Sequence, residues 1–310
     1  MSTNSNSRPV LDVPAEIVLL IVDHLDLHDL FFLSQTSRRL RSISKRNWVS
    51  KLGEMPVEDK LKFWYGLAYV LPDYWACRTC CRLHSVDPLD IPSSYCGRHR
   101  IHGTRLLYGY NLQDHHKQLA LKYKRLGYDH ALEPLLRPHE EIFGSKKYPL
   151  QKYSARPKID NNQFLLDERW TLTPKASLKD RTPRPKCNVT VCAHMMLSAT
   201  ELRWNHEGPK WVISVDGLNE RLFLQLWENE PYKQYRCSCS KCLTSLAVEM
   251  DSTCCVVVQA FHNYGPFSSP EDEASEVHLR NAQTISIRRV RQWSEFLSAG
   301  SLFVDSDAVA

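Results

Sequence analysis

The sequence lacks the long apolar runs and the short catalytic motifs by which many proteins can be classified directly. No stretch of its 310 residues approaches eighteen consecutive apolar residues, and the polar first ten residues contain no apolar core of a signal peptide. We therefore expect an intracellular protein, in the cytoplasm or the nucleus, that does not bind membranes. A G-x-x-x-x-G-K-S/T loop, a G-x-G-x-x-G loop and an H-E-x-x-H helix are also missing, and we expect no enzymatic activity.

A concentrated charge of one sign is missing as well. The net charge is +5, with 40 Lys and Arg residues against 35 Asp and Glu residues. This balance disfavours nucleic acid as a partner, because dedicated nucleic-acid-binding proteins gather their basic residues on one face. The composition, 43% hydrophobic and 10% aromatic, is that of a globular protein, so most of the chain should fold.

Cysteine, in contrast, is abundant, with 11 residues. In a reducing compartment most of these side chains stay as thiols. Paired cysteine spacings therefore indicate metal or redox chemistry before they indicate disulfides.

Residues 9–50 have the pattern of three short helices. Pro14 suits a first helical turn, Asp26 can cap a second helix, and Thr36-Ser37 offers a cap for a third. The first helix carries an apolar stripe at spacings of three and four, made of Ile17, Leu20, Ile21 and Leu25. So small a unit has little interior, and a partner or the rest of the chain must cover its apolar surface.

The same segment resembles the F-box motif. The match runs through Val13-Pro14-Ala15-Glu16-Ile17, Leu25, Asp29-Leu30, Leu33 and Ser37-Arg38-Arg39-Leu40. The resemblance implies a module that docks on the Skp-type adaptor of cullin-based ubiquitin ligases. The residues expected to bind this partner or to form the module core are Pro14, Ile17, Leu20, Ile21, Leu25, Leu30, Leu33 and Leu40. The alternative is a helical hairpin that packs on the remainder of the chain.

The rest of the chain predicts a mixed domain. An apolar, aromatic helix is expected within 55–75, as part of that domain's core, and another helix is expected to end at Gly127. A short strand is expected at 164–166, and several strands rich in β-branched and aromatic residues follow Cys187. The predicted fold class is α+β, with an antiparallel sheet in the C-terminal half. The expected parts are a disordered tail at 1–8, the F-box at 9–50, the mixed domain at 51–303 and a second tail at 304–310.

Within the mixed domain, the order of several segments resembles a group of fungal F-box proteins of largely unassigned function. These segments are WACRTCCRLHSVD, QLALKYKRLG, KIDNNQFLLDERW, the CAH triplet, CSCSKC and CCVVVQAFHNYG. The resemblance implies an F-box protein with a cysteine-bearing C-terminal domain, and it identifies no substrate.

The Cys/His-rich segment 74–102 contains the clearest metal-binding pattern. Cys77-x2-Cys80 is followed after fifteen residues by Cys96-x2-His99, the two-knuckle spacing of a structural zinc site. Three further residues are alternative ligands at this site, namely Cys81, His84 and His102. The opposing interpretation treats the thiols as small buried residues.

A second candidate zinc site combines Cys192-x-His194 with Cys239-x2-Cys242, and Cys187 or Cys237 is near enough in sequence to replace one of these ligands. The two halves are separated by more than forty residues, so the sequence alone does not bring them together.

A catalytic role for these cysteines and histidines has less support in the sequence than metal binding. A redox-active Cys77-x2-Cys80 pair would need a βαβ setting that the surrounding sequence does not provide. A Cys-His hydrolase has no specific signature among 11 cysteines and 13 histidines. His115 and His116 are interpreted as surface residues at a helix start.

We therefore expect a non-catalytic, substrate-recognition subunit of a Skp/cullin-type ubiquitin ligase, with an unknown protein substrate and structural zinc. The alternative is a zinc-bearing module that binds nucleic acid or protein independently of any ligase.

Overall fold

The computed structural model consists of two compact units, Met1–Val86 and Asp87–Ala310. It describes residues 13–44, 46–92, 110–143, 150–173, 187–192, 194–203, 209–216, 222–226, 234–251 and 255–266. The tails expected at 1–8 and 304–310 lie outside these ranges. The division at Val86 falls well beyond residue 50, where the sequence placed the end of the first part.

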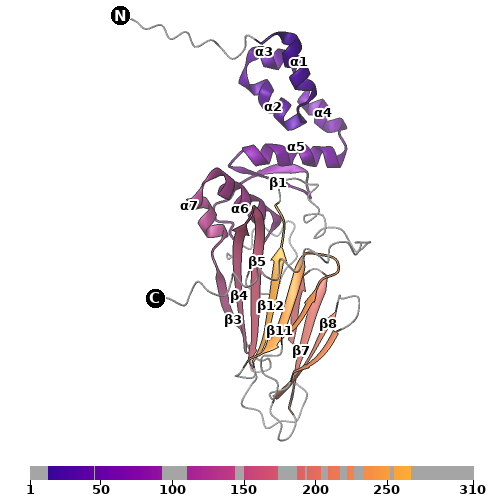
Figure 1. Cartoon of the computed structure of the whole chain (residues 1–310). Helices are drawn as coiled ribbons and strands as arrows, with labels where there is room; N and C mark the ends of the chain where they lie inside the picture. The colour runs from indigo at the N-terminus through magenta and orange to yellow at the C-terminus, as the bar shows by residue number, and fades with distance from the viewer. Residues whose placement is uncertain are drawn as a thin grey trace, which may run out of the picture. The chain divides into compact units, whose positions relative to one another are not determined.

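The first unit begins with the three expected helices, which are α1 (Ala15–Asp23), α2 (Leu27–Thr36) and α3 (Arg38–Ile43) (Figure 1). Pro14 directly precedes α1, as its fixed backbone angle favours. The Ser37 side chain accepts a hydrogen bond from the Leu40 amide at 3.1 Å, which caps α3. Asp26 occupies the cap position of α2 without a side-chain hydrogen bond.

Two further helices and a hairpin complete the first unit. They are α4 (Trp48–Glu54), α5 (Val57–Val70), β1 (Tyr74–Cys77) and β2 (Arg82–Ser85). The Phe63 ring of α5 packs edge-on against Phe31 of α2 at 5.9 Å and stacks on Trp48 of α4 at 6.1 Å. These aromatic contacts place α5 in the core of the first unit, whereas the sequence analysis placed the corresponding helix in the mixed domain.

The second unit begins with the helices α6 (Asp114–Leu126) and α7 (Asp129–Leu132) and the 3-10 turn η1 (Glu133–Leu135). Gly127 ends α6 in the left-handed conformation, with φ of 71°, as the sequence predicted. Figure 1 shows α6 and α7 beside one end of the long strands β4 and β5. Among the described residues, no helix is long and apolar enough to cross a membrane.

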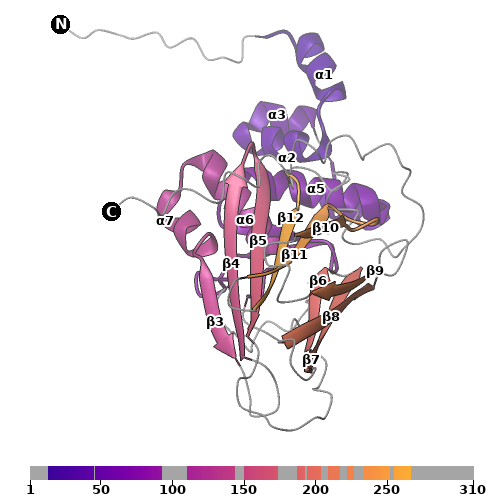
Figure 2. The ribbon, with the colours of Figure 1, turned by 60° about the horizontal axis from the view of Figure 1, so that its bottom comes forward.

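Two antiparallel sheets form most of the second unit, which confirms the α+β fold class. The six-stranded sheet has the order β10 (Tyr235–Ser238), β11 (Thr244–Met250), β12 (Val256–Asn263), β5 (Gln163–Thr173), β4 (Leu150–Asp160) and β3 (His139–Phe143). The four-stranded sheet has the order β6 (Cys187–Cys192), β7 (Met195–Arg203), β8 (Pro209–Asp216) and β9 (Leu222–Leu226) (Figure 2).

The strands β4 and β5 are longer than the short strand expected at 164–166. Each has 11 residues, and they are joined at Asn161 and Asn162, whose φ angles of 47° and 57° suit a tight hairpin turn. Proline has no backbone N–H to donate within a sheet. Because β3 pairs with β4 only as far as Ala155, Pro157 interrupts no hydrogen bonds between these two strands.

One apolar core connects the two sheets. Trp170 and Leu172 of the six-stranded sheet belong to the same buried cluster as Trp211 and Ile213 of the four-stranded sheet. The side chains of one face of each sheet therefore pack against each other, as in a β-sandwich.

Candidate functional site

Helix α1 is apolar on two sides. Val18 and Val22 are buried in the core of the first unit, each 8% exposed. Ile17, Leu20 and Ile21 are 46%, 59% and 51% exposed. We call these three exposed residues the α1 face. Large apolar side chains gathered at this exposure on a nine-residue helix are typical of a surface that a partner covers.

The other residues of the expected docking set have different positions. Leu30 and Leu40 are buried, at 1% and 8% exposure, so a docked partner would not reach them. Leu25 and Leu33 are partly buried against the same cluster, and Pro14 is exposed at the start of α1. Burial thus separates two roles that helical periodicity left together, with Leu30 and Leu40 assigned to the module core.

The first predicted metal site is described only in part. Cys77, Cys80 and His84 each place one donor atom within 4.8 Å of the others, at the turn of the β1–β2 hairpin. The Cys80 Sγ and His84 Nε2 atoms are 2.9 Å apart. His84 was an alternative ligand in the sequence pattern, whereas Cys96, His99 and His102 lie outside the described residues.

The second predicted metal site is brought together by the structure. Cys192, His194, Cys239 and Cys242 place one donor atom each within 4.8 Å of one another. Cys192 ends β6 and His194 lies in the turn to β7, while the two later cysteines lie in the connection from β10 to β11. Two hairpins from different sheets thus supply two donors each, and three thiols with one imidazole are a donor set that holds metal ions.

The three thiols of this cluster influence one another. Hydrogen bonds with Cys192 and Cys242 lower the pKa of Cys239, whereas hydrogen bonds with Cys192 and Cys239 raise the pKa of Cys242. The hydrogen bond to Cys239 also raises the pKa of Cys192, to about 11. One thiolate therefore forms easily while its neighbours keep their protons, which a bound cation would displace.

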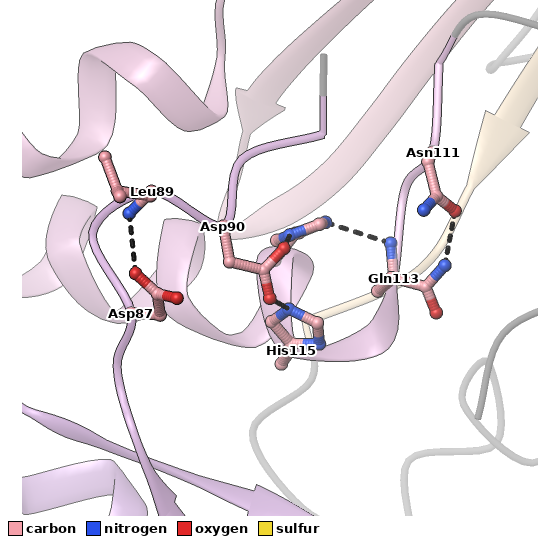
Figure 3. A network of polar contacts seen from close by, with 7 residues as sticks. Asp87, Leu89, Asp90, Asn111, Gln113 and His115 are labelled. Carbon is pink, nitrogen blue, oxygen red and sulfur yellow. Dashed lines mark hydrogen bonds and ion pairs between the residues drawn. The ribbon is translucent and has the colours of Figure 1, made fainter. Parts of the chain in front are cut away.

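A third polar cluster was missed by the sequence analysis. Asp90 binds the Nε2 atoms of His115 at 2.8 Å and of His116 at 3.2 Å, next to the first turn of α6 (Figure 3). His116 is 1% exposed, so the expectation that it lies on the surface is wrong. The Nδ1 atom of His116 accepts a hydrogen bond from the Gln113 amide at 3.1 Å, so both of its ring nitrogens are engaged. This arrangement holds the start of α6, and Asp90, His115 and His116 place one donor atom each within 4.8 Å of one another.

Burial and hydrogen bonding have opposite effects on the pKa values of the Asp90 cluster. Burial alone would raise the pKa of the Asp90 carboxyl, but hydrogen bonds from His115 and His116 outweigh it and hold the pKa well below its usual range. Burial lowers the pKa of His116, partly offset by its hydrogen bond to Asp90. In the same region, the backbone amide of Asn111 donates a hydrogen bond to the Pro92 carbonyl at 2.8 Å. This hydrogen bond connects the chain just before residues 93–109 to the chain just after them.

The first unit is a small helical module with an exposed apolar helix, and the second unit is rich in antiparallel sheet. Comparison with protein families identifies the module, because residues 10–51 match the F-box domain. The chain therefore carries an F-box domain. F-box domains bind Skp-type adaptors, and at the family level they mark non-catalytic substrate-recognition subunits of Skp/cullin-type ubiquitin ligases. No curated protein and no solved structure matches the chain.

Proposed function

We propose that this protein recognises a target protein for a Skp/cullin-type ubiquitin ligase, and that it binds the Skp-type adaptor through the α1 face. The exposure of Ile17, Leu20 and Ile21 carries the proposal. Burying one leucine or isoleucine side chain fully contributes about 1.5–3 kcal/mol relative to leaving it exposed. A partner that covers this face gains about half of that free energy at each side chain, because each is already about half buried. The buried side of α1 packs in the core of the first unit and holds the helix in place.

The protein's contribution would be proximity. A target held by the second unit would stay near the ubiquitin-charged enzyme of the ligase, which raises its effective concentration there. No bond chemistry on this chain is required for that role.

Copurification with a Skp-type adaptor tests the docking step. We expect the full chain with Leu20→Asp and Ile21→Asp to lose the adaptor, because two carboxylates would then be placed in an apolar contact. Val57→Asp is the matched control, since Val57 is 54% exposed in the same unit, outside residues 10–51, at the first position of α5. Asp is favourable at that position, so this control should fold. Wild-type adaptor binding by a folded double variant would overturn the proposal.

The target is tested separately. We expect a specific protein to copurify with the full chain when ubiquitin-dependent degradation is blocked, and to stay bound to the Leu20→Asp, Ile21→Asp variant. Loss of that protein together with the adaptor would contradict target binding by the second unit.

We also propose that zinc is the ion of the Cys/His clusters and that its role is structural. Thiolate and imidazole donors suit zinc, and four protein ligands leave no open position for a reacting water. Elemental analysis of the purified chain tests this, and a chain without zinc would overturn it.

A further inference from the structure

A row of buried polar side chains leads away from the second cysteine cluster into the core of the second unit. The Cys242 Sγ atom lies 3.2 Å from the Thr244 hydroxyl, which lies 3.1 Å from His262 Nδ1. His262 Nε2 lies 2.8 Å from a Glu168 carboxylate oxygen, and the Tyr153 hydroxyl donates to the other oxygen at 2.5 Å. A continuous set of polar contacts thus extends from a predicted metal ligand to the middle of the sheet.

This row crosses four neighbouring strands. Thr244 of β11 is directly opposite His262 of β12. Glu168 of β5 lies diagonally opposite His262, and Tyr153 of β4 lies diagonally opposite Glu168. All four side chains face the apolar core: Thr244 is 0% exposed, His262 and Tyr153 are each 2% exposed, and Glu168 is 5% exposed. A buried polar group without a partner is costly, so such a row persists only where its members satisfy one another.

Thr244 and His262 lie directly behind the Cys242 sulfur in this row of contacts. The Glu168 carboxylate accepts a hydrogen bond from Tyr153, and its other oxygen lies 2.8 Å from His262 Nε2, while His262 Nδ1 lies 3.1 Å from the Thr244 hydroxyl. The Thr244 hydroxyl is held between His262 Nδ1 and the Cys242 sulfur, and its single proton can be donated to one of them at a time. Partners of this kind orient the ligands of a metal ion and are part of how the site binds it.

The backbone around the cluster is also arranged for ligation. The Lys241 amide donates to Cys239 Sγ at 3.4 Å, and the Cys239 and Thr244 amides donate to the Thr244 and Cys242 carbonyls at 2.9 and 2.8 Å. On the other hairpin, the pairing of β6 with β7 shifts by one residue between Thr190 and Cys192. The Nδ1 atom of His194 is buried and has no hydrogen-bond partner among the described residues.

We propose that Cys192, His194, Cys239 and Cys242 form one closed zinc centre that joins the two sheets of the second unit, with Thr244, His262 and Glu168 as positioning residues behind Cys242. The inference rests on the proposed zinc and is independent of adaptor docking. The Zn²⁺ ion displaces the thiol protons on binding, so the site links the β6–β7 hairpin to the β10–β11 hairpin.

Zinc content tests the ligand set. In the full chain, Cys239→Ser should hold one zinc per chain fewer than the wild type. Cys237→Ser is the matched control, because Cys237 is two residues away on β10 and is not in the cluster, and it should keep the wild-type content. A Cys239→Ser chain with wild-type zinc content would overturn the assignment.

The wild-type chain provides a second measurement that does not depend on the folding of a variant. We expect zinc to protect Cys192, Cys239 and Cys242 together from alkylation, and a chelator to expose all three together. An unchanged alkylation pattern after chelation would overturn the proposed centre.

The positioning residues are tested in a Cys80→Ser background, which removes the β1–β2 cluster as a competing site. Thr244→Val should weaken zinc binding about 10–100-fold in competition with a chromophoric chelator, while Thr244→Ser should restore it. Thr173→Val is the matched control, because the Thr173 hydroxyl contacts Cys255, a thiol outside the cluster, at 3.6 Å. Equal affinity of the Thr244→Val and parent chains would overturn the positioning role and leave the zinc centre standing. A parent chain that holds no zinc would overturn both.

Discussion

The two units differ at one apolar helix face and one buried polar row. The first unit exposes half of Ile17 and more of Leu20 on one short helix, whereas the second unit buries Trp211 and Ile213 completely between its sheets. The second unit instead contains a polar row within its core, centred on Glu168 and His262. The described part of the first unit thus has an exposed apolar surface on α1, and the described part of the second unit has a row of polar contacts inside its core.

This difference predicts how each unit responds to mutation. In the first unit, changes to the exposed apolar face should affect binding and leave folding intact, because those side chains make few contacts within the chain. In the second unit, changes to buried polar groups should affect folding, because their partners would be left unsatisfied.

The largest effect is expected in the polar row of the second unit. Glu168→Ala should lower the free energy of unfolding by about 3–5 kcal/mol, because His262 and Tyr153 would lose their buried acceptor. Glu140→Ala is the matched control: this exposed glutamate pairs with Lys152 at 3.2 Å on the six-stranded sheet. Its loss should cost at most about 1 kcal/mol. Urea unfolding measures both, and equal costs would contradict the importance of the buried row.

The next largest effect is expected at a buried leucine of the first unit, and an exposed leucine of the same unit provides the comparison. Leu30→Ala should destabilise this unit by about 2–5 kcal/mol, because Leu30 is 1% exposed and its removal leaves a cavity. Leu20→Ala should change stability by no more than about 0.5 kcal/mol and weaken adaptor binding instead. Hydrogen exchange of α2 in the full chain measures the first effect, and adaptor affinity measures the second. Equal destabilisation by both changes would place Leu20 in the core.

Local signals in the sequence predicted local structure well. Ser37 and Gly127 mark helix ends through contacts within a few residues, and both occupy those positions in the structure. The spacing of Cys239 and Cys242 was also visible, but their meeting with Cys192 depends on how two sheets pack. That packing is set by contacts far apart in the chain, which spacing does not encode.

Two errors in the sequence analysis have physical reasons. His116 was placed on the surface, although it lies on the same stripe as Leu119, Ala120 and Tyr123, which are all buried. That periodicity could have indicated its burial, whereas its partner Asp90 lies too far away in sequence to be paired with it. The length of β4 was hidden because charged residues and a proline interrupt its apolar pattern.

A smaller effect is expected at the start of α6. Asp90→Asn should lower the free energy of unfolding by about 1.5–3 kcal/mol at pH 7, because hydrogen bonds from two histidines to a charged group are weakened. The pKa of Asp90 is lower in the folded chain than its unfolded value of about 3.9. Its contribution is therefore present above about pH 4 and is lost as the pH falls further. Urea unfolding of both chains from pH 7 to pH 3 should show the difference narrowing, and a constant difference would exclude the carboxylate as its source.

The smallest changes in stability are expected at two glycines, one from each unit. Gly127→Ala should destabilise the second unit by about 1 kcal/mol, because the φ of 71° at the end of α6 is strained for any residue with a Cβ. Gly53→Ala should stabilise α4 by about 0.5–1 kcal/mol, because a Cβ there meets nothing within 4 Å and alanine favours the helix. Thermal unfolding of the full chain measures both shifts. Shifts of the same sign would mean that backbone conformation at Gly127 is not what sets the end of α6.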